Sequence, residues 1–179
     1  MAKINSIINE PEAAAPQVLD DKVDAMIDAV SNHERVFVYG TGRSGLMLKA
    51  FAMRLMQLGL TAYVVGETTT PSVKRGDLLV IASASGETDS VVSAVSKAVK
   101  GGVDVAAITG SHESSVSRLV KPLVTIDSST KFSTSSASAQ PLGSLFEQML
   151  LLYFDSIALK MSQAANNVSD MASRHASIE

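Results

Sequence analysis

The chain has 179 residues, 46% hydrophobic and 18% charged, which is typical of a globular protein and sufficient for one domain with a buried core. Its formal net charge of −3 and its 4% aromatic content argue against the clustered basic and stacking side chains of nucleic-acid binding. The absence of cysteine excludes disulfides, thiolate metal sites and a cysteine nucleophile. No apolar run is long enough for a membrane span, and the first residues do not resemble a signal peptide. We therefore expect a cytoplasmic protein with no nucleic-acid or membrane partner.

Taken in chain order, residues 4–33 carry apolar side chains at helical spacing, and Pro11 and Pro16 divide them into two predicted helical segments. From residue 35 onward, short β-prone runs alternate with amphipathic stretches. Strands are expected at residues 36–39, 61–65, 78–82, 103–109 and 123–126, and helices at 46–58, 88–100, 141–161 and 166–174.

This alternation predicts an α/β fold, a three-layer αβα sandwich with a doubly wound, five-stranded parallel sheet. We expect one domain over residues 1–179, with N-terminal helices at 1–34, an α/β core at 35–160 and a C-terminal helix and tail at 161–179.

Ligands of open parallel sheets bind beyond the carboxyl ends of the strands, where three loops attract attention. One is Gly40-Thr41-Gly42-Arg43-Ser44, after the first strand. The second is Ser83-Ala84-Ser85-Gly86-Glu87-Thr88, after the third. The last is the stretch 128–138 after the fifth strand, which is rich in serine and threonine.

The second loop predicts anion binding. It opens a helix, whose N-terminus presents unpaired N–H groups and a partial positive charge. Gly86 allows close backbone approach, and Ser83, Ser85 and Thr88 add hydroxyl donors, so phosphate is the expected anion. The alternative is that Ser85 or Thr88 only caps the helix.

The first loop places Gly42, Arg43 and Ser44 where they can face the same ligand. A Gly-x-Gly turn after a strand also occurs in dinucleotide sites, and Glu67 after the next strand would then bind the ribose, which leaves NAD as a minor alternative. Arg43 is expected either to contact the ligand or to pair with Glu87.

Together the two loops resemble those of the SIS (sugar isomerase) domain family, over about residues 36–159. The resemblance implies a sugar phosphate held by the second loop, with no metal or other cofactor, in a homo-oligomer (dimer or tetramer) with active sites at subunit interfaces. Ala84 departs from the glutamine common in aminosugar-phosphate members, which argues against an aminosugar substrate.

Three further segments resemble the 6-phospho-3-hexuloisomerase branch of that family: residues 66–71, residues 140–148 and residues 174–179. This resemblance implies interconversion of D-arabino-3-hexulose 6-phosphate and D-fructose 6-phosphate, in the ribulose monophosphate pathway of formaldehyde fixation. It also places Gln140 beside the substrate. The alternatives are another SIS isomerase, acting on a pentose or heptose phosphate, and a non-catalytic sugar-phosphate sensor.

Moving a carbonyl between C3 and C2 through an enediol requires a base, and Glu147 is the candidate. Its apolar helical neighbours predict partial burial, which should make the carboxylate a better base, although a surface glutamate paired with a cation is the alternative. His175 is the second catalytic candidate, as an acid or proton shuttle, because SIS isomerases often borrow a histidine from a neighbouring subunit. Its alternative is a residue of a disordered tail.

Overall fold

Five parallel strands form one sheet in the order β2-β1-β3-β4-β5 in a computed structural model, which describes residues 3–18, 20–127, 138–164 and 168–176. The strands are β1 (Arg35–Tyr39), β2 (Thr61–Val64), β3 (Leu78–Ser83), β4 (Asp104–Thr109) and β5 (Val124–Thr125). All residues of β3 are buried, as expected for a central strand covered on both faces. The predicted parallel five-stranded sheet is confirmed.

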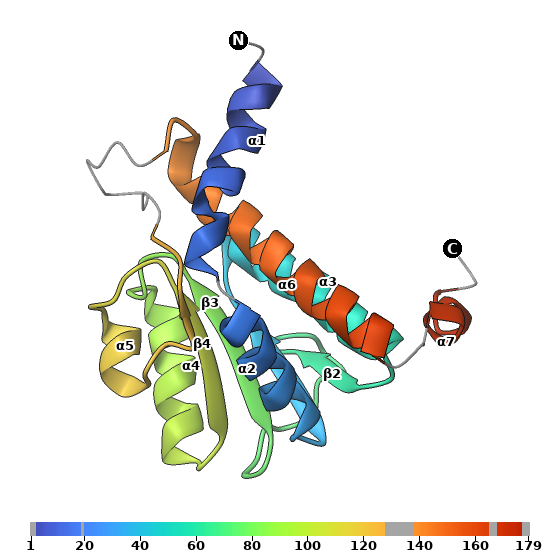
Figure 1. Ribbon diagram of the computed structural model, residues 1–179. Coiled ribbons are helices and arrows are strands. Elements are labelled where there is room, and N and C mark those ends of the chain that lie inside the picture. Colours follow the sequence, from blue (N-terminus) through green and yellow to red (C-terminus); the bar gives the residue numbers. More distant parts are fainter. Residues whose placement is uncertain (1–2, 19, 128–137, 165–167, 177–179) are drawn as a thin grey trace.

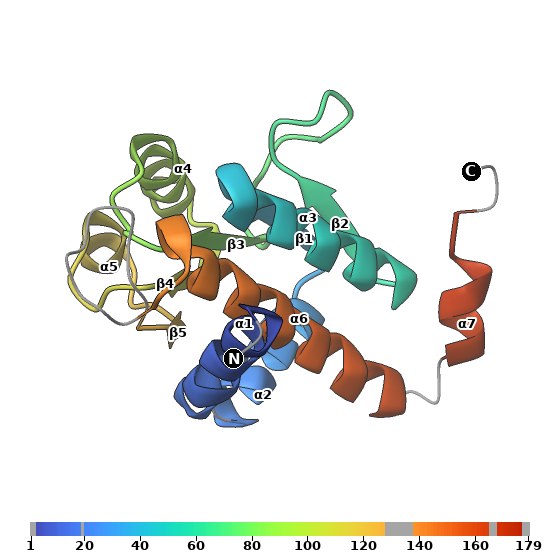
Figure 2. The same ribbon diagram turned by 90° about the horizontal axis from the view of Figure 1, so that it is seen from above.

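Helices cover both faces of this sheet (Figures 1 and 2). They are α1 (Lys3–Ala14), α2 (Asp20–Ser31), α3 (Gly42–Gln57), α4 (Asp89–Lys100), α5 (Ser115–Leu119), α6 (Ser144–Ala164) and α7 (Val168–Ser173), with 3-10 turns at Ala15–Gln17 and Pro141–Gly143. Helices α2, α3 and α6 pack on one face, and α4 and α5 cover the other. Helix α1 projects away from the sheet, and α7 lies beyond the end of α6 (Figures 1 and 2). The three-layer αβα sandwich is therefore confirmed.

Three local predictions differ from the structure. Pro11 lies inside α1 and does not end it, so the interruption falls at the turn that contains Pro16. The fifth strand is shorter than predicted. Helix α5 was not predicted, because five residues are too few to show helical periodicity.

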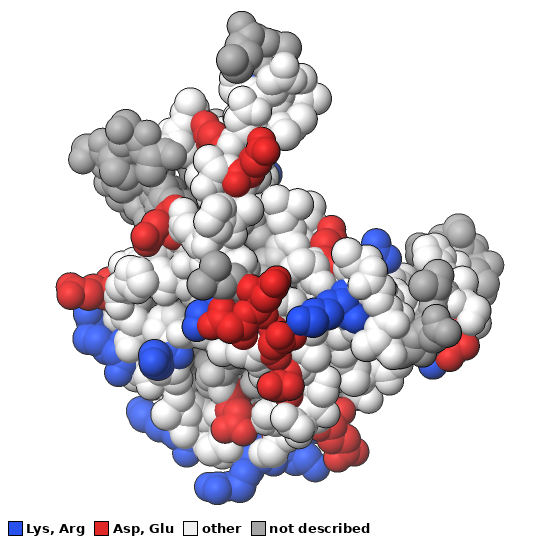
Figure 3. All heavy atoms as spheres, in the orientation of Figure 1, with Lys and Arg blue, Asp and Glu red and all other residues white. Residues whose placement is uncertain are grey.

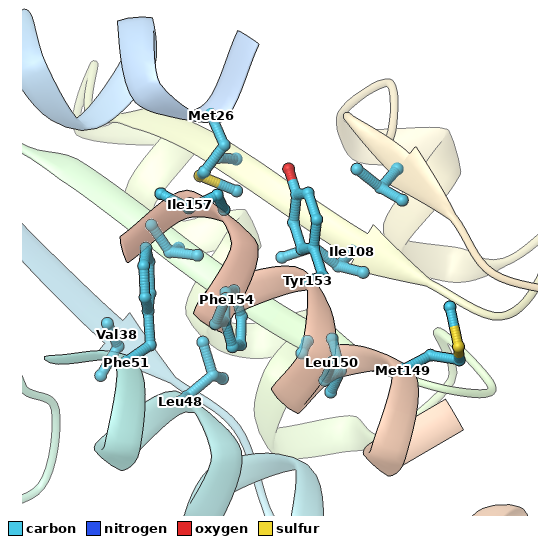
Figure 4. Packing of buried hydrophobic residues seen from close by; sticks show 14 of the residues in the cluster. Met26, Val38, Leu48, Phe51, Ile108, Met149, Leu150, Tyr153, Phe154 and Ile157 are labelled. Carbon is cyan, nitrogen blue, oxygen red and sulfur yellow. The ribbon is translucent and has the colours of Figure 1, made fainter. Parts of the chain in front are cut away.

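The larger core lies between the sheet and α6 (Figure 4). Phe154 of α6 stacks on Phe51 of α3 with ring centroids 4.2 Å apart, and the Tyr153 hydroxyl donates a hydrogen bond to the Lys22 carbonyl. The segment Pro141–Ala164 is long and apolar enough to cross a membrane, but 56% of its most apolar window is buried inside the protein. Its apolar character is therefore that of a core helix. The packing of α6 in this core holds the first turn of the helix over the sheet.

A buried ion pair joins the starts of β1 and β3. Arg35 Nε and Nη2 donate to the two carboxylate oxygens of Asp77 at 2.8 and 2.6 Å, and the Lys74 N–H donates to Oδ2 at 2.7 Å. Burial alone would raise the pKa of Asp77, but the hydrogen bonds from Arg35 and Lys74 outweigh it and hold the pKa below its usual value of 3.8. The pair aligns the two strands whose opposite ends carry the candidate loops.

Replacing Asp77 by asparagine should lower the free energy of unfolding by about 2–3 kcal/mol, less than for a fully buried pair because Arg35 keeps some access to water. Since the pKa of Asp77 is lowered on folding, its contribution is complete above pH 3.8 and is lost as the pH falls through the lower folded-state value. Urea denaturation at neutral and acidic pH measures both effects. An equal difference between the two proteins at pH 7 and below pH 3 would contradict this account.

Candidate functional site

A cavity of about 260 Å³ opens at the carboxyl ends of β1 and β3. These neighbouring strands send their following helices to opposite faces of the sheet, which is where ligands of doubly wound folds bind. The cavity is lined by the loop after β1, the loop after β3 and the start of α6. Its lining residues are Thr41, Arg43, Ser44, Ala82, Ser83, Ala84, Ser85, Thr88, Leu142 and Glu147.

The loop after β3, residues 83–88, supplies three hydroxyl groups to this cavity. Ser83 Oγ accepts a hydrogen bond from the Gly86 N–H at 3.1 Å, and Ser85 Oγ accepts one from the Glu87 N–H at 3.2 Å. Thr88 is the N-cap residue of α4, yet its side chain makes no capping hydrogen bond. The capping alternative therefore does not apply to Thr88, whose hydroxyl contacts Ser83 Oγ at 3.3 Å beside the cavity. We call residues 83–88 the phosphate loop.

Gly86 has a conformation and a packing position that only glycine suits. Its φ is +64°, in the left-handed region, and an added Cβ would overlap the Ser114 side chain. The Gly86 carbonyl accepts a hydrogen bond from the Val116 N–H at 3.0 Å. The phosphate loop thus rests directly on the first turn of α5.

The loop after β1 brings a second helix N-terminus to the cavity. Thr41 is the N-cap of α3 and, like Thr88, makes no side-chain capping bond. Gly42 follows with φ +58°, and a side chain on Gly45 would overlap the Gly40 carbonyl. Two helix N-termini without side-chain caps therefore face one cavity, an arrangement that favours an anion.

The sequence supports the dinucleotide alternative by more than a Gly-x-Gly turn. Gly40, Gly42 and Gly45 together have the full G-x-G-x-x-G spacing. In the structure, however, the expected ribose ligand Glu67 forms an ion pair with Lys49 at 2.7 Å and does not line the cavity. The glycines serve close packing of α3 against the end of β1.

Glu147 and Arg43 both line the cavity and form an ion pair with each other. Arg43 Nη1 lies 2.9 Å from Glu147 Oε2 and donates a hydrogen bond to Ser144 Oγ at 3.0 Å. The Glu147 side chain is 10% exposed and that of Arg43 is 52% exposed. The predicted partial burial of Glu147 is observed, and its cationic partner lies inside the site and not on an outer surface.

The suggested pairing of Arg43 with Glu87 was wrong. Glu87 accepts hydrogen bonds from Ser115 and lies 3.8 Å from Arg118, on the side of the loop away from the cavity. Its pKa is lowered, first by the Ser115 hydroxyl and then by the Ser115 N–H. Arg43 therefore does not pair with Glu87 and lies in the lining of the cavity.

Two predicted site residues lie outside this cluster. Gln140 is not among the lining residues, and its amide bonds to Glu10 at 2.9 Å and to Gln148. His175 is exposed and follows α7, where Arg174 donates to the Gln57 carbonyl at the C-terminal end of α3. That end is about 20 Å along the helix from Arg43, so His175 does not reach Glu147 of the same chain. Most of the hydroxyl-rich stretch, residues 128–137, lies outside the described residues.

The sequence reading missed Leu142, which lines the cavity although it is 69% exposed. Its φ of +60° is unusual for a residue other than glycine. No sequence pattern favours leucine there, and the flanking Pro141 and Gly143 are the only local sign of a turn. Across the described part of the chain, no group of three or more His, Asp or Glu side chains is arranged to hold a metal ion.

Comparison with known proteins agrees with this site. Residues 29–152 match the SIS domain family, and the chain belongs to that family. The 3-hexulose-6-phosphate isomerase of Bacillus subtilis (strain 168) is 38% identical over 179 residues, covering 98% of this chain and 97% of that protein. The enzyme of the same name from Mycobacterium gastri is 36% identical, covering 98% and 89%. The predicted SIS membership is confirmed.

A solved structure supports the same assignment. A protein from Methanococcus jannaschii, for which a molecular function of 3-hexulose-6-phosphate isomerase has been inferred, superimposes with a TM-score of 0.85. It is 28% identical in sequence, and the match covers 100% of both chains. The likeness therefore includes the N-terminal and C-terminal helices as well as the sheet.

Replacing Thr88 by valine tests whether its hydroxyl binds an anion. The change removes one hydroxyl but keeps the β-branched shape, so we expect the Kd for inorganic phosphate to rise about 3- to 10-fold. The melting temperature should change only slightly, because the side chain makes no capping bond and its hydroxyl contact with Ser83 Oγ is long, at 3.3 Å. Calorimetric titration measures the Kd, and Ser93→Ala on the exposed side of α4 is the control. An unchanged Kd with a lower melting temperature would return Thr88 to a capping role.

Proposed function

We propose that the protein interconverts D-arabino-3-hexulose 6-phosphate and D-fructose 6-phosphate. The observation that carries the proposal is one cavity that combines a hydroxyl-rich helix N-terminus with a buried glutamate paired to arginine. The named relatives, which match over nearly the whole chain, support the particular substrate. The reaction would belong to the ribulose monophosphate pathway of formaldehyde fixation, in the cytoplasm.

In this proposal the phosphate loop binds the 6-phosphate through Ser83, Ser85, Thr88 and the N–H groups of α4, with Gly86 giving close approach. A phosphate fixed at one end places the sugar chain along the cavity toward Glu147. Glu147 removes the proton from C2, the 2,3-enediol forms, and a proton returns to C3. A proton also moves from the C2 oxygen to the C3 oxygen, so that the atoms balance.

Arg43 stabilises the negative charge that develops on the enediol oxygens. Its side chain is half exposed and is held beside the cavity by Glu147 and Ser144. A short movement of this side chain is therefore enough to bring the guanidinium to the enediol oxygens. A 3-ketose phosphorylated at C6 has no free hydroxyl placed to close a five- or six-membered ring. It therefore reaches the base in open-chain form.

Glu147→Gln tests the base. We expect kcat to fall by about 10²- to 10⁴-fold with little change in KM, because the carboxamide cannot accept the C2 proton. Formation of fructose 6-phosphate from the 3-hexulose phosphate is the measurement. Asp155→Asn, the same chemical change on the exposed side of α6, is the control.

Different results separate the competing functions. If the wild type converts a pentose or heptose phosphate and not the hexulose phosphate, another SIS isomerase is indicated. Sugar-phosphate binding without turnover of any of them would indicate a sensor. Full activity of Glu147→Gln would remove Glu147 as the base but keep the enzyme class.

We further propose that the protein is a homo-oligomer, a dimer or tetramer, whose active sites lie at subunit interfaces. The support is an apolar groove between α1 and α6 whose hydrophobic lining includes Ile7, Ile8, Pro11, Leu151 and Leu152. Helix α1 projects from the sheet (Figure 1), and Figure 3 shows both uncharged and acidic surface along it. Its side chains Ile4, Ile7 and Ile8 are exposed. Covering this groove with a second copy would bury surface that is costly to leave in water. A neighbouring subunit could then bring His175 to the site.

A mixing experiment tests the shared site. Glu147→Gln and His175→Gln subunits should each be nearly inactive, and co-expression should restore about a quarter of the wild-type activity, since only sites with both native residues work. Light scattering on the wild type gives the subunit number. A monomer, or a mixture no more active than its parents, would contradict the shared site, and full activity of His175→Gln alone would remove its catalytic role.

A further inference from the structure

Glu87 is an acidic residue in a loop that binds an anion, and its position resolves this apparent conflict. Although it lies between Gly86 and Thr88, it is not among the residues that line the cavity. Its Oε1 accepts a hydrogen bond from the Ser115 N–H at 2.8 Å, and its Oε2 accepts one from Ser115 Oγ at 2.5 Å. The carboxylate is therefore directed away from the ligand and onto the start of α5.

The negative charge of Glu87 is balanced on that outer side. Arg118 Nη2 lies 3.8 Å from Glu87 Oε1 and donates to Ser115 Oγ at 2.7 Å. The carboxylate also faces the first turn of a helix, where negative charge is favourable. The lowered pKa of Glu87 has the same origin, the two bonds from Ser115, so the group stays ionised at neutral pH.

Helix α5 is itself held rigidly at this point. Ser114 and Ser117 form a capping box, in which each side chain accepts a hydrogen bond from the backbone N–H of the other. Next to it, Gly86 packs against Ser114 and accepts from the Val116 N–H. The phosphate loop is thus fixed to α5 twice, through the backbone at Gly86 and through the side chain at Glu87.

The two attachments have different consequences if one is lost. The backbone contact at Gly86 is independent of the Glu87 side chain, so the fold of the loop survives its removal. The N–H groups and hydroxyls on either side of Glu87 would then sample more conformations, and binding phosphate would have to restrict them again. Such a loss weakens binding and leaves the base at Glu147 untouched.

We propose that Glu87 is a positioning residue, whose bonds to Ser115 hold the phosphate loop in its phosphate-binding conformation. The inference rests on the proposed function of that loop, and it adds α5 to the parts of the chain that determine substrate affinity. It assigns the five-residue helix α5 a role as the rigid support of the binding loop.

The direction of the effect distinguishes this role from simple electrostatics. If Glu87 acted only as a nearby negative charge, removing it would reduce repulsion and tighten phosphate binding. If it positions the loop, Glu87→Ala should raise KM for fructose 6-phosphate and Ki for inorganic phosphate by the same factor, about 3- to 10-fold, with kcat nearly unchanged. Glu87→Gln, which can still accept from Ser115, should give a smaller rise.

Glu113→Ala is the matched control. Glu113 is an exposed glutamate close to α5 in sequence, and its side chain makes no hydrogen bond or ion pair with any residue that the structure describes. This variant removes the same charge from the same region without touching Ser115, so KM should stay the same or fall. A merely structural role of Glu87 would lower the melting temperature of the variant without changing KM of its folded fraction.

A double-mutant cycle with Ser115→Ala completes the test. Ser115→Ala alone should raise KM less than Glu87→Ala, because the Ser115 N–H bond remains, and it should add nothing to Glu87→Ala. An unchanged or lower KM in Glu87→Ala, or additive effects in the double variant, would overturn the proposal. Calorimetric binding of inorganic phosphate gives the same comparison if the wild type fails to turn over the hexulose phosphate, so failure of the two proposals can be told apart.

Discussion

The site depends on the direct pairing of β1 with β3 in a parallel sheet. Tyr39 at the end of β1 lies in register with Ile81 near the end of β3, so both following loops leave the same edge at nearly the same height. Helix α3 then turns to one face of the sheet and α4 to the other. The crevice between the two turns is a consequence of this backbone topology and does not depend on particular side chains. The Arg35–Asp77 pair at the opposite ends of the two strands holds the same alignment.

A protein with net negative charge that binds a phosphorylated ligand needs its own negative charges offset near the site. The structure offsets them with two glutamate–arginine pairs. The net charge is −3, and two glutamates, Glu87 and Glu147, lie in or beside the site. Each faces an arginine, Arg118 outside the cavity and Arg43 inside it. In the proposed mode of binding, the anion is held by the N–H groups and hydroxyls of the two helix N-termini. Glu87 is bonded outward to Ser115 and Glu147 is paired with Arg43, so the negative charge of each carboxylate is offset close to the site.

The features that were predictable from sequence are those that repeat or that need one residue type. Buried parallel strands such as β3 are recognisable in the sequence as apolar runs. A loop such as 83–88 is recognisable because it needs glycine at a left-handed position and has hydroxyl side chains around it. Contacts between distant segments could not be predicted. Nothing near Gln140 indicates that its amide bonds to Glu10, and nothing near Glu87 indicates that it bonds to Ser115 rather than to Arg43. Helix α5 was missed for lack of length, and its capping box has serine at the position where the sequence signature has Glu or Gln.

Those distant contacts explain why residues outside the cavity matter to it. Glu10 of α1 accepts hydrogen bonds from the Ser138 hydroxyl, the Ala139 N–H and the Gln140 amide, and its pKa is lowered chiefly by the Ser138 bond. These three residues lead directly into the turn at Leu142 and the first turn of α6, which carries Glu147. The start of α6 is therefore held from outside by α1, just as the phosphate loop is held from outside by α5. The loop after β3 and the segment before α6 are thus each bonded to a helix that contributes no residue to the lining of the cavity. The segments that resemble a hexuloisomerase therefore need not all be in contact with substrate.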